Sequence, residues 1–151
     1  MISILVVCLG NICRSPLAHG ILQSKLPETK FYVDSAGTAA YHIGEKPDTR
    51  SILVAKEHGI DISIQSARQF VTSDFDTFDI IYAMDQSNFD NITNLARTTA
   101  DINKIKLFLD ENHDVVNKNV PDPYYGDAND FNQVFDLIEH TSNQLVKKLQ
   151  S

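Results

Sequence analysis

The N-terminal segment constrains the fold most strongly, because an apolar run passes directly into a short loop and then into helix-starting residues. The run is apolar apart from Ser3 and predicts a buried strand over Ile2–Cys8. Ser15 is a favoured N-cap residue, and Pro16 suits the first position of a helix. We therefore expect a strand, a tight loop and a helix that runs from Pro16 to about Lys25.

The loop between this strand and helix has the composition of an anion-binding site. Its backbone N–H groups gather at a helix N-terminus, a place that binds tetrahedral oxyanions and favours the thiolate form of a cysteine. Glycine and asparagine tolerate the left-handed backbone that converging N–H groups require. A nucleophilic sulfur, a phosphate cradle and a guanidinium in one loop predict phosphate-ester chemistry through a phosphocysteine. The loop residues are Cys8, Leu9, Gly10, Asn11, Ile12, Cys13, Arg14 and Ser15.

Displacement at phosphorus needs a nucleophile, stabilisation of the phosphoryl charge and a proton for the leaving oxygen. We expect Cys8 to be the nucleophile and the Ser15 hydroxyl to hydrogen-bond its sulfur. Arg14 is six residues after Cys8 and can grip two phosphoryl oxygens with a planar fork that lysine lacks. Asp122 is the candidate general acid, because prolines on both sides stiffen its backbone.

Tyrosines near the candidate acid predict a slot for an aromatic group. Tyr124 and Tyr125 follow Asp122 closely, and we expect Tyr41 on the opposite wall. A deep slot that ends in a phosphate cradle favours aryl phosphates, because phosphoserine is too short to reach the sulfur. The predicted substrate class is therefore phosphotyrosine.

The rest of the chain alternates strands and helices, which predicts an α/β fold with a parallel sheet and right-handed crossovers. Ligands of such sheets bind at the carboxyl ends of the strands, where four of the segments named here converge. These are the Cys8 loop, Ser35-Ala36-Gly37, Asp85 and the long polar loop Asp110–Asp130. The other predicted elements are strands over Phe31–Ser35, Ile80–Met84 and Lys104–Leu109, a helix from Pro47-Asp48 to His58-Gly59, a short helix over Thr72–Thr77, and a helix over Phe131–Leu149.

Composition narrows the functional classes. A length of 151 residues suits one domain over 1–151, and a net charge of −7 argues against nucleic acid as a partner. No apolar stretch is long enough for a membrane span, and the N-terminus lacks the layout of a signal peptide. We expect a cytoplasmic protein without membrane association, although export by a leaderless route stays open. Two cysteines exclude a disulfide framework, and no Cys/His cluster has metal-ligand spacing.

Two residues, Cys13 and Asp85, each have a structural and a functional interpretation. Cys13 is either a small buried hydrophobe or the partner of Cys8 in a reversible protective disulfide. Asp85 either caps the next helix or orients Arg14. Three acidic residues around the short helix are interpreted as solvated charge, and the five histidines as scattered on helix faces or loops, with no role assigned. These are Asp74, Asp76 and Asp79, and His19, His42, His58, His113 and His140.

Together these motifs resemble those of the low-molecular-weight protein tyrosine phosphatases. The resemblance implies a three-layer, Rossmann-like fold with a four-stranded parallel sheet, no metal and no cofactor. It implies that Cys8 is the nucleophile, that Arg14 binds the phosphoryl oxygens, and that Asp122 is the acid that then activates water. The matching segments span almost the full chain: 6–16, 34–38, 47–50, 67–69, Phe78-Asp79, Met84-Asp85 and 122–126.

The resemblance also assigns supporting roles and exposes two departures. It implies that Ser15 assists the thiolate and that Asn11 with Ser35 supports the loop. Many relatives carry a histidine where this chain has Gln65, which can donate the same hydrogen bond but cannot titrate. Many relatives have tryptophan at the slot wall where Tyr41 falls, so the fine substrate preference is open.

Three other functions could use parts of the same motif. Arsenate reductases with this loop relay oxidation to cysteines after the third strand, and residues 84–100 contain none. A phosphocysteine carrier of sugar uptake would need neither Arg14 nor Asp122, and a non-catalytic phosphotyrosine binder would not need an intact nucleophile and acid. We expect a phosphotyrosine protein as substrate, inorganic phosphate or another oxyanion in the site, and a monomer or weak homodimer. The physiological substrate stays open.

Overall fold

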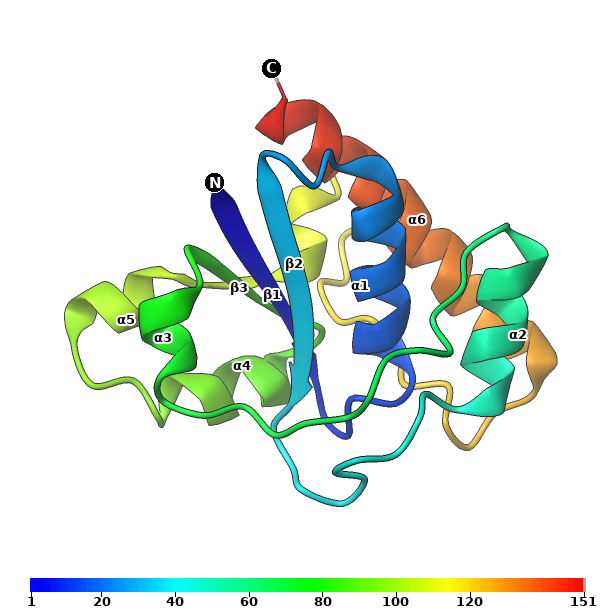
Figure 1. Cartoon of the computed structure of the whole chain (residues 1–151), viewed down its shortest axis with the longest axis horizontal. Helices are drawn as coiled ribbons and strands as arrows, with labels where there is room; N and C mark the ends of the chain where they lie inside the picture. Colours follow the sequence, from blue (N-terminus) through cyan, green and yellow to red (C-terminus); the bar gives the residue numbers. More distant parts are fainter. Residues whose placement is uncertain (151) are drawn as a thin grey trace.

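The computed structural model describes residues 1–150, which build a sheet of four parallel strands between helices (Figure 1). The strand order is β2-β1-β3-β4. The strands are β1 (Ile2–Cys8), β2 (Phe31–Gly37), β3 (Ile80–Ala83) and β4 (Ile105–Leu107). The expected α/β fold with a parallel sheet is confirmed.

Strand β1 is central because its side chains serve two apolar cores. Ile4 and Val6 point into one core, whereas Leu5 and Val7 point into the other, and all four are fully buried. This alternation follows from the two-residue period of a strand. A strand buried on both faces reads as a continuous apolar run, which explains the sequence pattern.

Helices cover both faces of the sheet (Figure 1). Helices α1, α2 and α6 pack together beside one face, and α3 and α4 contribute to the core on the other face. Helix α5 and the 3₁₀ helix η1 flank β4 on either side in the chain. The helical bounds are α1 Arg14–Lys25, α2 Thr49–Glu57, α3 Asp74–Thr77, α4 Gln86–Thr93, α5 Thr99–Asn103, η1 Phe108–Glu111 and α6 Ala128–Leu149.

Helix α1 begins earlier than predicted, and the N-cap assignment of Ser15 is wrong. The helix starts at Arg14, its N-cap is Cys13, and no side chain caps it. The hydroxyl of Ser15 instead faces the sulfur of Cys8 at 3.0 Å. The Ser15 hydroxyl therefore makes a tertiary contact with the sulfur, whereas local propensity would have it cap the helix.

Other boundaries shifted for identifiable reasons. Strand β2 continues to Gly37, where the N–H of Gly37 bonds to the carbonyl of Arg68 at 2.8 Å. Strand β4 is shorter than predicted because the chain turns into η1 at Phe108. Helix α6 begins at Ala128, since Asp127 and Asp130 form a capping box before the predicted start.

Helix α2 has the caps that its sequence predicts. The carboxylate of Asp48 accepts the N–H of Arg50 at 2.9 Å, which caps the N-terminus. Gly59 follows the helix with φ of 78°, the left-handed conformation that glycine adopts without steric cost.

Helix α6 is amphipathic rather than uniformly apolar. Its buried positions include Phe131, Val134, Phe135 and Ile138, spaced by three or four residues so that they share one face. Within residues 1–150, no helix combines the length and apolar character needed to cross a bilayer.

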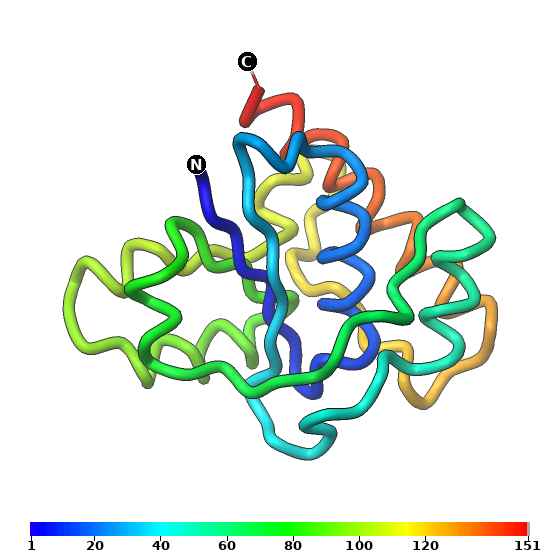
Figure 2. Tube along the Cα trace, in the orientation of Figure 1, coloured from blue at the N-terminus to red at the C-terminus, as the bar shows by residue number. Residues whose placement is uncertain are grey.

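The carboxyl ends of the strands gather segments that are distant in sequence (Figure 2). The loop after β1 meets the segment after β2, because Thr38 and Ala39 donate N–H bonds to the carbonyls of Cys8 and Leu9 at 2.9 Å. A methyl group on Gly37 would lie 2.8 Å from the Leu9 carbonyl oxygen, so only glycine permits this approach. The predicted convergence at this edge is confirmed.

Candidate active site

The loop after β1 turns its carbonyl groups outward. The carbonyls of Cys8, Leu9 and Ile12 accept N–H groups from neighbouring segments at 2.8–2.9 Å. Because the C=O and N–H of a trans peptide point in opposite directions, the N–H groups of these peptides face the inside of the loop. The loop thus has the orientation of an anion cradle.

Two hydrogen bonds connect the middle of the loop with the sulfur of Cys8. Asn11 has φ of 57°, the one left-handed residue other than glycine in the described chain. Its side-chain nitrogen Nδ2 donates to Ser15 Oγ at 2.7 Å, and Ser15 Oγ lies 3.0 Å from Cys8 Sγ. All three side chains are buried. The expected contact between Ser15 and Cys8 is present.

The guanidinium of Arg14 is oriented by two hydrogen-bond acceptors. Its Nη1 donates to Asp85 Oδ2 at 2.7 Å and to the carbonyl of Val120 at 3.0 Å. Burial lowers the pKa of Arg14, but negative charge at Cys8 and the carboxylates of Asp85 and Asp122 outweigh burial, so its pKa is raised. The guanidinium is therefore both charged and oriented.

Both interpretations of Asp85 are correct, because each of its two carboxylate oxygens accepts a different hydrogen bond. Oδ1 accepts the N–H of Asn88 at 2.8 Å and caps helix α4, whereas Oδ2 accepts from Arg14. A single carboxylate thus connects the start of α4 with Arg14 at the end of the loop after β1.

Asp122 lines the same pocket as residues of the loop. Its Oδ2 is 3.7 Å from Arg14 Nη2, and its Oδ1 accepts the N–H of Tyr124 at 3.1 Å. Its side chain is 42% exposed, so it borders the opening of the pocket. Cys8, Arg14 and Asp122 line the same pocket of about 140 Å³.

The mouth of the pocket is aromatic. Tyr41, Tyr124 and Tyr125 line it as expected, and Tyr124 meets Tyr125 edge to face with ring centroids 5.0 Å apart. His42 lines the mouth as well, with its ring centroid 6.2 Å from that of Tyr124. Sequence reasoning gave His42 no role, and an isolated histidine carries no signal that distinguishes a pocket wall from a surface position.

Comparison with known proteins decides the family. A model described as low molecular weight phosphotyrosine protein phosphatase matches residues 3–151. The enzyme of that name from Schizosaccharomyces pombe is 41% identical over 153 residues, which cover 98% of this chain and 97% of the relative. This chain belongs to the low molecular weight phosphotyrosine protein phosphatase family.

Solved structures agree with that assignment. A protein tyrosine phosphatase from Entamoeba histolytica with Hepes in its active site superposes with a TM-score of 0.93 at 36% identity, covering 99% of this chain and 97% of that one. Wzb of Vibrio vulnificus in complex with benzylphosphonate superposes with a TM-score of 0.87 at 32% identity, covering 97% and 98%. The chain is a phosphatase of phosphotyrosine, and the arsenate reductase and phosphocysteine carrier alternatives receive no support.

Cys13 shares the phosphatase loop with Cys8, and both cysteines are free and buried. Burial, together with negative charge at Asp48, Cys8 and Asp122, raises the pKa of Cys13 to about 12, against a smaller opposing effect of the Ser51 hydroxyl. Cys13 is therefore a neutral thiol at physiological pH, which fits its reading as a buried hydrophobe. A reversible disulfide with Cys8 stays a prediction.

Ser35 supports the phosphatase loop less directly than expected. Its hydroxyl shares a hydrogen bond of 2.8 Å with Nδ1 of His19, a buried residue of α1. The side-chain oxygen of Asn11 instead accepts the N–H of Arg68 at 3.1 Å. Burial lowers the pKa of His19, opposed by Asp34 and reinforced by Arg68. Sequence reasoning missed His19 because its partner comes from another element.

Gln65, at which the resemblance led us to expect a departure from the family, contacts the start of helix α1. Its Nε2 donates to the carbonyl of Pro16 at 3.1 Å, so it supports the first turn of α1. Its Oε1 is buried and finds no hydrogen-bond partner among the described residues. The supporting contact is therefore made with one end of the amide only.

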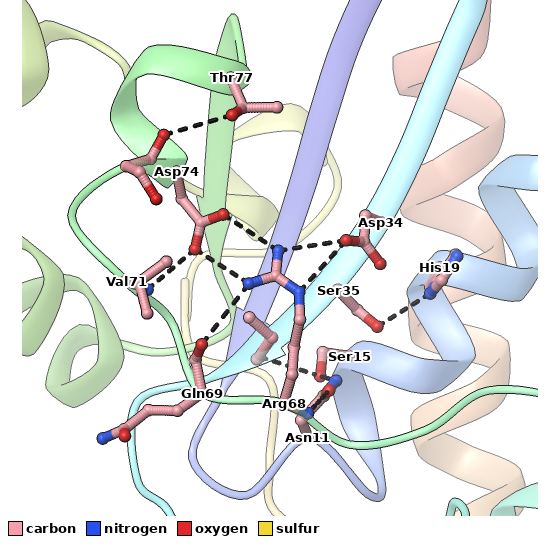
Figure 3. Close-up of polar contacts among 12 residues, drawn as sticks. Asn11, Ser15, His19, Asp34, Ser35, Arg68, Gln69, Val71, Asp74 and Thr77 are labelled. Atoms are coloured by element: carbon pink, nitrogen blue, oxygen red, sulfur yellow. Dashed lines mark hydrogen bonds and ion pairs between the residues drawn. The ribbon is translucent and has the colours of Figure 1, made fainter. Parts of the chain in front are cut away.

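The ion pair between Arg68 and Asp74, close to the site, differs from what the sequence predicts (Figure 3). Asp74 was expected to be solvated, but it is 6% exposed and accepts two hydrogen bonds from the guanidinium of Arg68. The interpretation of Asp74 as solvated charge is wrong. Charge patterning around a four-residue helix cannot reveal a partner that lies outside it.

Proposed function

We propose that this phosphatase hydrolyses phosphotyrosine with Cys8 as nucleophile, Arg14 as phosphoryl clamp and Asp122 as proton donor. In the first step the Cys8 thiolate attacks phosphorus, the bond from phosphorus to the phenolic oxygen breaks, and Asp122 gives its proton to that oxygen. The phosphoryl group is then bonded to sulfur, and tyrosine leaves.

In the second step water attacks the phosphocysteine. Asp122, now a carboxylate, takes a proton from the water as the oxygen bonds to phosphorus and the phosphorus–sulfur bond breaks. Inorganic phosphate and the Cys8 thiolate are released. The Ser15 hydroxyl, 3.0 Å from the sulfur, stabilises the departing thiolate.

One observation carries this assignment. The guanidinium of Arg14 is oriented by Asp85 and lines the same small pocket as the sulfur of Cys8 and the carboxylate of Asp122. A nucleophile, a charge-stabilising fork and an acid that line one pocket are the groups that in-line phosphoryl transfer requires.

The substrate proposal rests on the shape and chemistry of the pocket. Aromatic walls above an anion cradle suit an aryl phosphate, and the related Wzb of Vibrio vulnificus binds benzylphosphonate. We propose a tyrosine-phosphorylated protein as substrate and inorganic phosphate as the product that occupies the loop. We further propose that residues 1–151 act as one catalytic domain, in the cytoplasm, as a monomer or weak homodimer.

The activity test uses p-nitrophenyl phosphate. The protein should release p-nitrophenol without added metal, and vanadate, an oxyanion that mimics phosphate, should inhibit it. Cys8→Ser should have no measurable turnover, because an alcohol at this position is a far poorer nucleophile than a thiolate. Full turnover by Cys8→Ser would overturn the proposal.

A second variant tests the acid. Asp122→Ala should lower kcat by about 10²-fold, the usual contribution of a positioned acid, while the Ki of phosphate changes little. An unchanged kcat with aryl phosphates would remove Asp122 from the proposed role. Asp127→Ala is the matched control, because this neighbouring carboxylate caps α6 and does not line the pocket.

A further inference from the structure

Arg68 connects two elements that are far apart in sequence. It lies in the segment between α2 and α3, and its guanidinium bridges Asp34 of β2 and Asp74 of α3 (Figure 3). Nε and Nη2 contact Asp34 Oδ2 at 3.2 and 3.1 Å, and Nη1 and Nη2 contact the two oxygens of Asp74 at 3.0 and 3.1 Å. This clamp fixes where residue 68 sits.

The main chain of the same residue bonds to the catalytic edge. Its N–H donates to Asn11 Oδ1 at 3.1 Å, and its carbonyl accepts the N–H of Gly37 at 2.8 Å. The side chain of Arg68 thus anchors a peptide group whose N–H contacts the one left-handed residue of the phosphate-binding loop.

The direction of each hydrogen bond follows from this contact. A backbone N–H can only donate, so the end of the Asn11 amide that faces Arg68 must be its oxygen. The other end, Nδ2, can only donate, and it does so to Ser15 Oγ at 2.7 Å. The Ser15 oxygen therefore accepts from Asn11.

That order determines where the single proton of Ser15 points. Cys8 Sγ lies 3.0 Å from the hydroxyl oxygen and the carbonyl of Ala36 lies 3.4 Å away, so the closer acceptor is the sulfur. If the Asn11 amide flipped, its oxygen would take the Ser15 proton and the sulfur would lose its donor. The N–H of Arg68 blocks that flip.

We propose that Arg68 is a positioning residue that keeps the Ser15 hydroxyl donating to the Cys8 thiolate, through a clamp that involves Asp34 and Asp74. The inference rests on the proposed role of Cys8 as nucleophile. Arg68 does not line the catalytic pocket, so it acts through Asn11 and Ser15 rather than on the substrate.

The chain offers a matched control. Arg97 bridges two carboxylates in the same way, with hydrogen bonds of 2.7 Å to Asp76 and 2.9 Å to Asp101. None of its hydrogen bonds reaches the phosphate-binding loop. Replacing either arginine removes a similar clamp, but only Arg68 contacts Asn11.

The experiment measures thiolate reactivity and turnover in Arg68→Ala and Arg97→Ala. Alkylation by iodoacetamide at about pH 6 reports Cys8, because the raised pKa keeps Cys13 a thiol. We expect the alkylation rate of Arg68→Ala to fall about tenfold, the loss of one hydrogen bond to a charged group, with a parallel fall in kcat/KM for p-nitrophenyl phosphate. Arg97→Ala should match wild type in both measurements.

Asp34→Asn and Asp74→Asn separate positioning from simple charge. Removing a negative charge near the loop would favour the thiolate and speed alkylation at about pH 6 if charge alone mattered. Positioning predicts slower alkylation, as in Arg68→Ala. These nearly isosteric variants also keep the test valid if Arg68→Ala does not fold.

Two outcomes would overturn the inference: rates for Arg68→Ala within twofold of those for Arg97→Ala, or faster alkylation in both aspartate variants. Failure of the proposed function would look different, because wild type would then lack turnover or Cys8→Ser would retain it. Equal losses of thermal stability in Arg68→Ala and Arg97→Ala, with loss of reactivity only in Arg68→Ala, support positioning over general destabilisation.

Discussion

The floor and the mouth of the catalytic pocket are built in opposite ways. The floor is the loop from Cys8 to Ser15, in which Arg14 is 2% exposed and Ser15 is fully buried. The mouth consists of Tyr41, His42, Tyr124 and Tyr125, and Tyr41 and Tyr125 are 76% and 96% exposed. The polar side chains Asn11, Arg14 and Ser15 of the floor are enclosed by protein, whereas Tyr41 and Tyr125 face solvent.

This difference has an energetic cause. A buried polar group without a partner costs about 1–3 kcal/mol, so polar groups of the floor need partners within the fold. The rings of Tyr41 and Tyr125 contact other rings of the mouth and solvent, so a change at either of them disturbs few neighbours. We therefore expect the reaction to depend on the floor and substrate preference to change at the mouth.

The largest expected effect breaks the floor. Arg14→Lys keeps the charge but loses the planar fork that Asp85 and the Val120 carbonyl orient. We expect kcat/KM for p-nitrophenyl phosphate to fall about 10²- to 10³-fold, as when one oxyanion-stabilising donor is removed.

The control for this change is Arg50→Lys, outside the floor. Arg50 bonds to Asp48 and to the carbonyl of Tyr124, so it also pairs with a carboxylate but does not line the pocket. A loss in Arg50→Lys as large as that in Arg14→Lys would contradict the distinction between the two regions.

A smaller effect is expected at the mouth. Tyr41→Ala removes one wall of the slot, and a lost aromatic contact of about 1 kcal/mol corresponds to a several-fold rise in KM for a phosphotyrosine peptide. Its kcat for p-nitrophenyl phosphate should stay near wild type. Tyr32→Ala is the control, because Tyr32 is exposed but stacks on Phe78 away from the pocket. A collapse of kcat in Tyr41→Ala would place Tyr41 in the catalytic machinery.

The smallest expected effect is on the free energy of unfolding and concerns the buried residue His19. Its pKa is lowered in the fold, mainly by burial, so the unfolded chain binds a proton more readily below the ordinary value of 6.5. The free energy of unfolding should therefore fall as pH drops through this value toward the folded pKa. His19→Gln keeps a partner for Ser35 and should flatten that decline, measured by urea unfolding at about pH 7.5 and pH 5.5. Parallel declines in wild type and variant would contradict the assignment.

The catalytic loop shows what local sequence can predict. Cys8 and Arg14 are separated by five residues in a loop between a strand and a helix, and this spacing alone brings both to one cradle. The element order placed Asp85 and Asp122 at the same edge of the sheet, because parallel strands align their carboxyl ends. Both inferences need only chain connectivity and strand geometry.

The contacts that support the catalytic loop could not be predicted from chain connectivity and strand geometry. Local sequence predicts Ser15 as a helix cap, but its hydroxyl contacts the sulfur of Cys8 instead. Local sequence also predicts a solvated Asp74, but its carboxylate pairs with Arg68. Each outcome depends on a partner brought close by folding, at a separation that no local pattern encodes.

By itself, then, the sequence determined which reactive groups this phosphatase carries in one loop and which sheet holds that loop, because Cys8, Arg14 and the strand-to-helix loop are contiguous in the chain. Only the tertiary structure decided how that chemistry is held in place: which carboxylate orients Arg14, which N–H faces Asn11 and which hydroxyl meets the sulfur. Short-range spacing is written into the covalent chain, whereas the direction of a buried hydrogen bond depends on elements that meet only after folding.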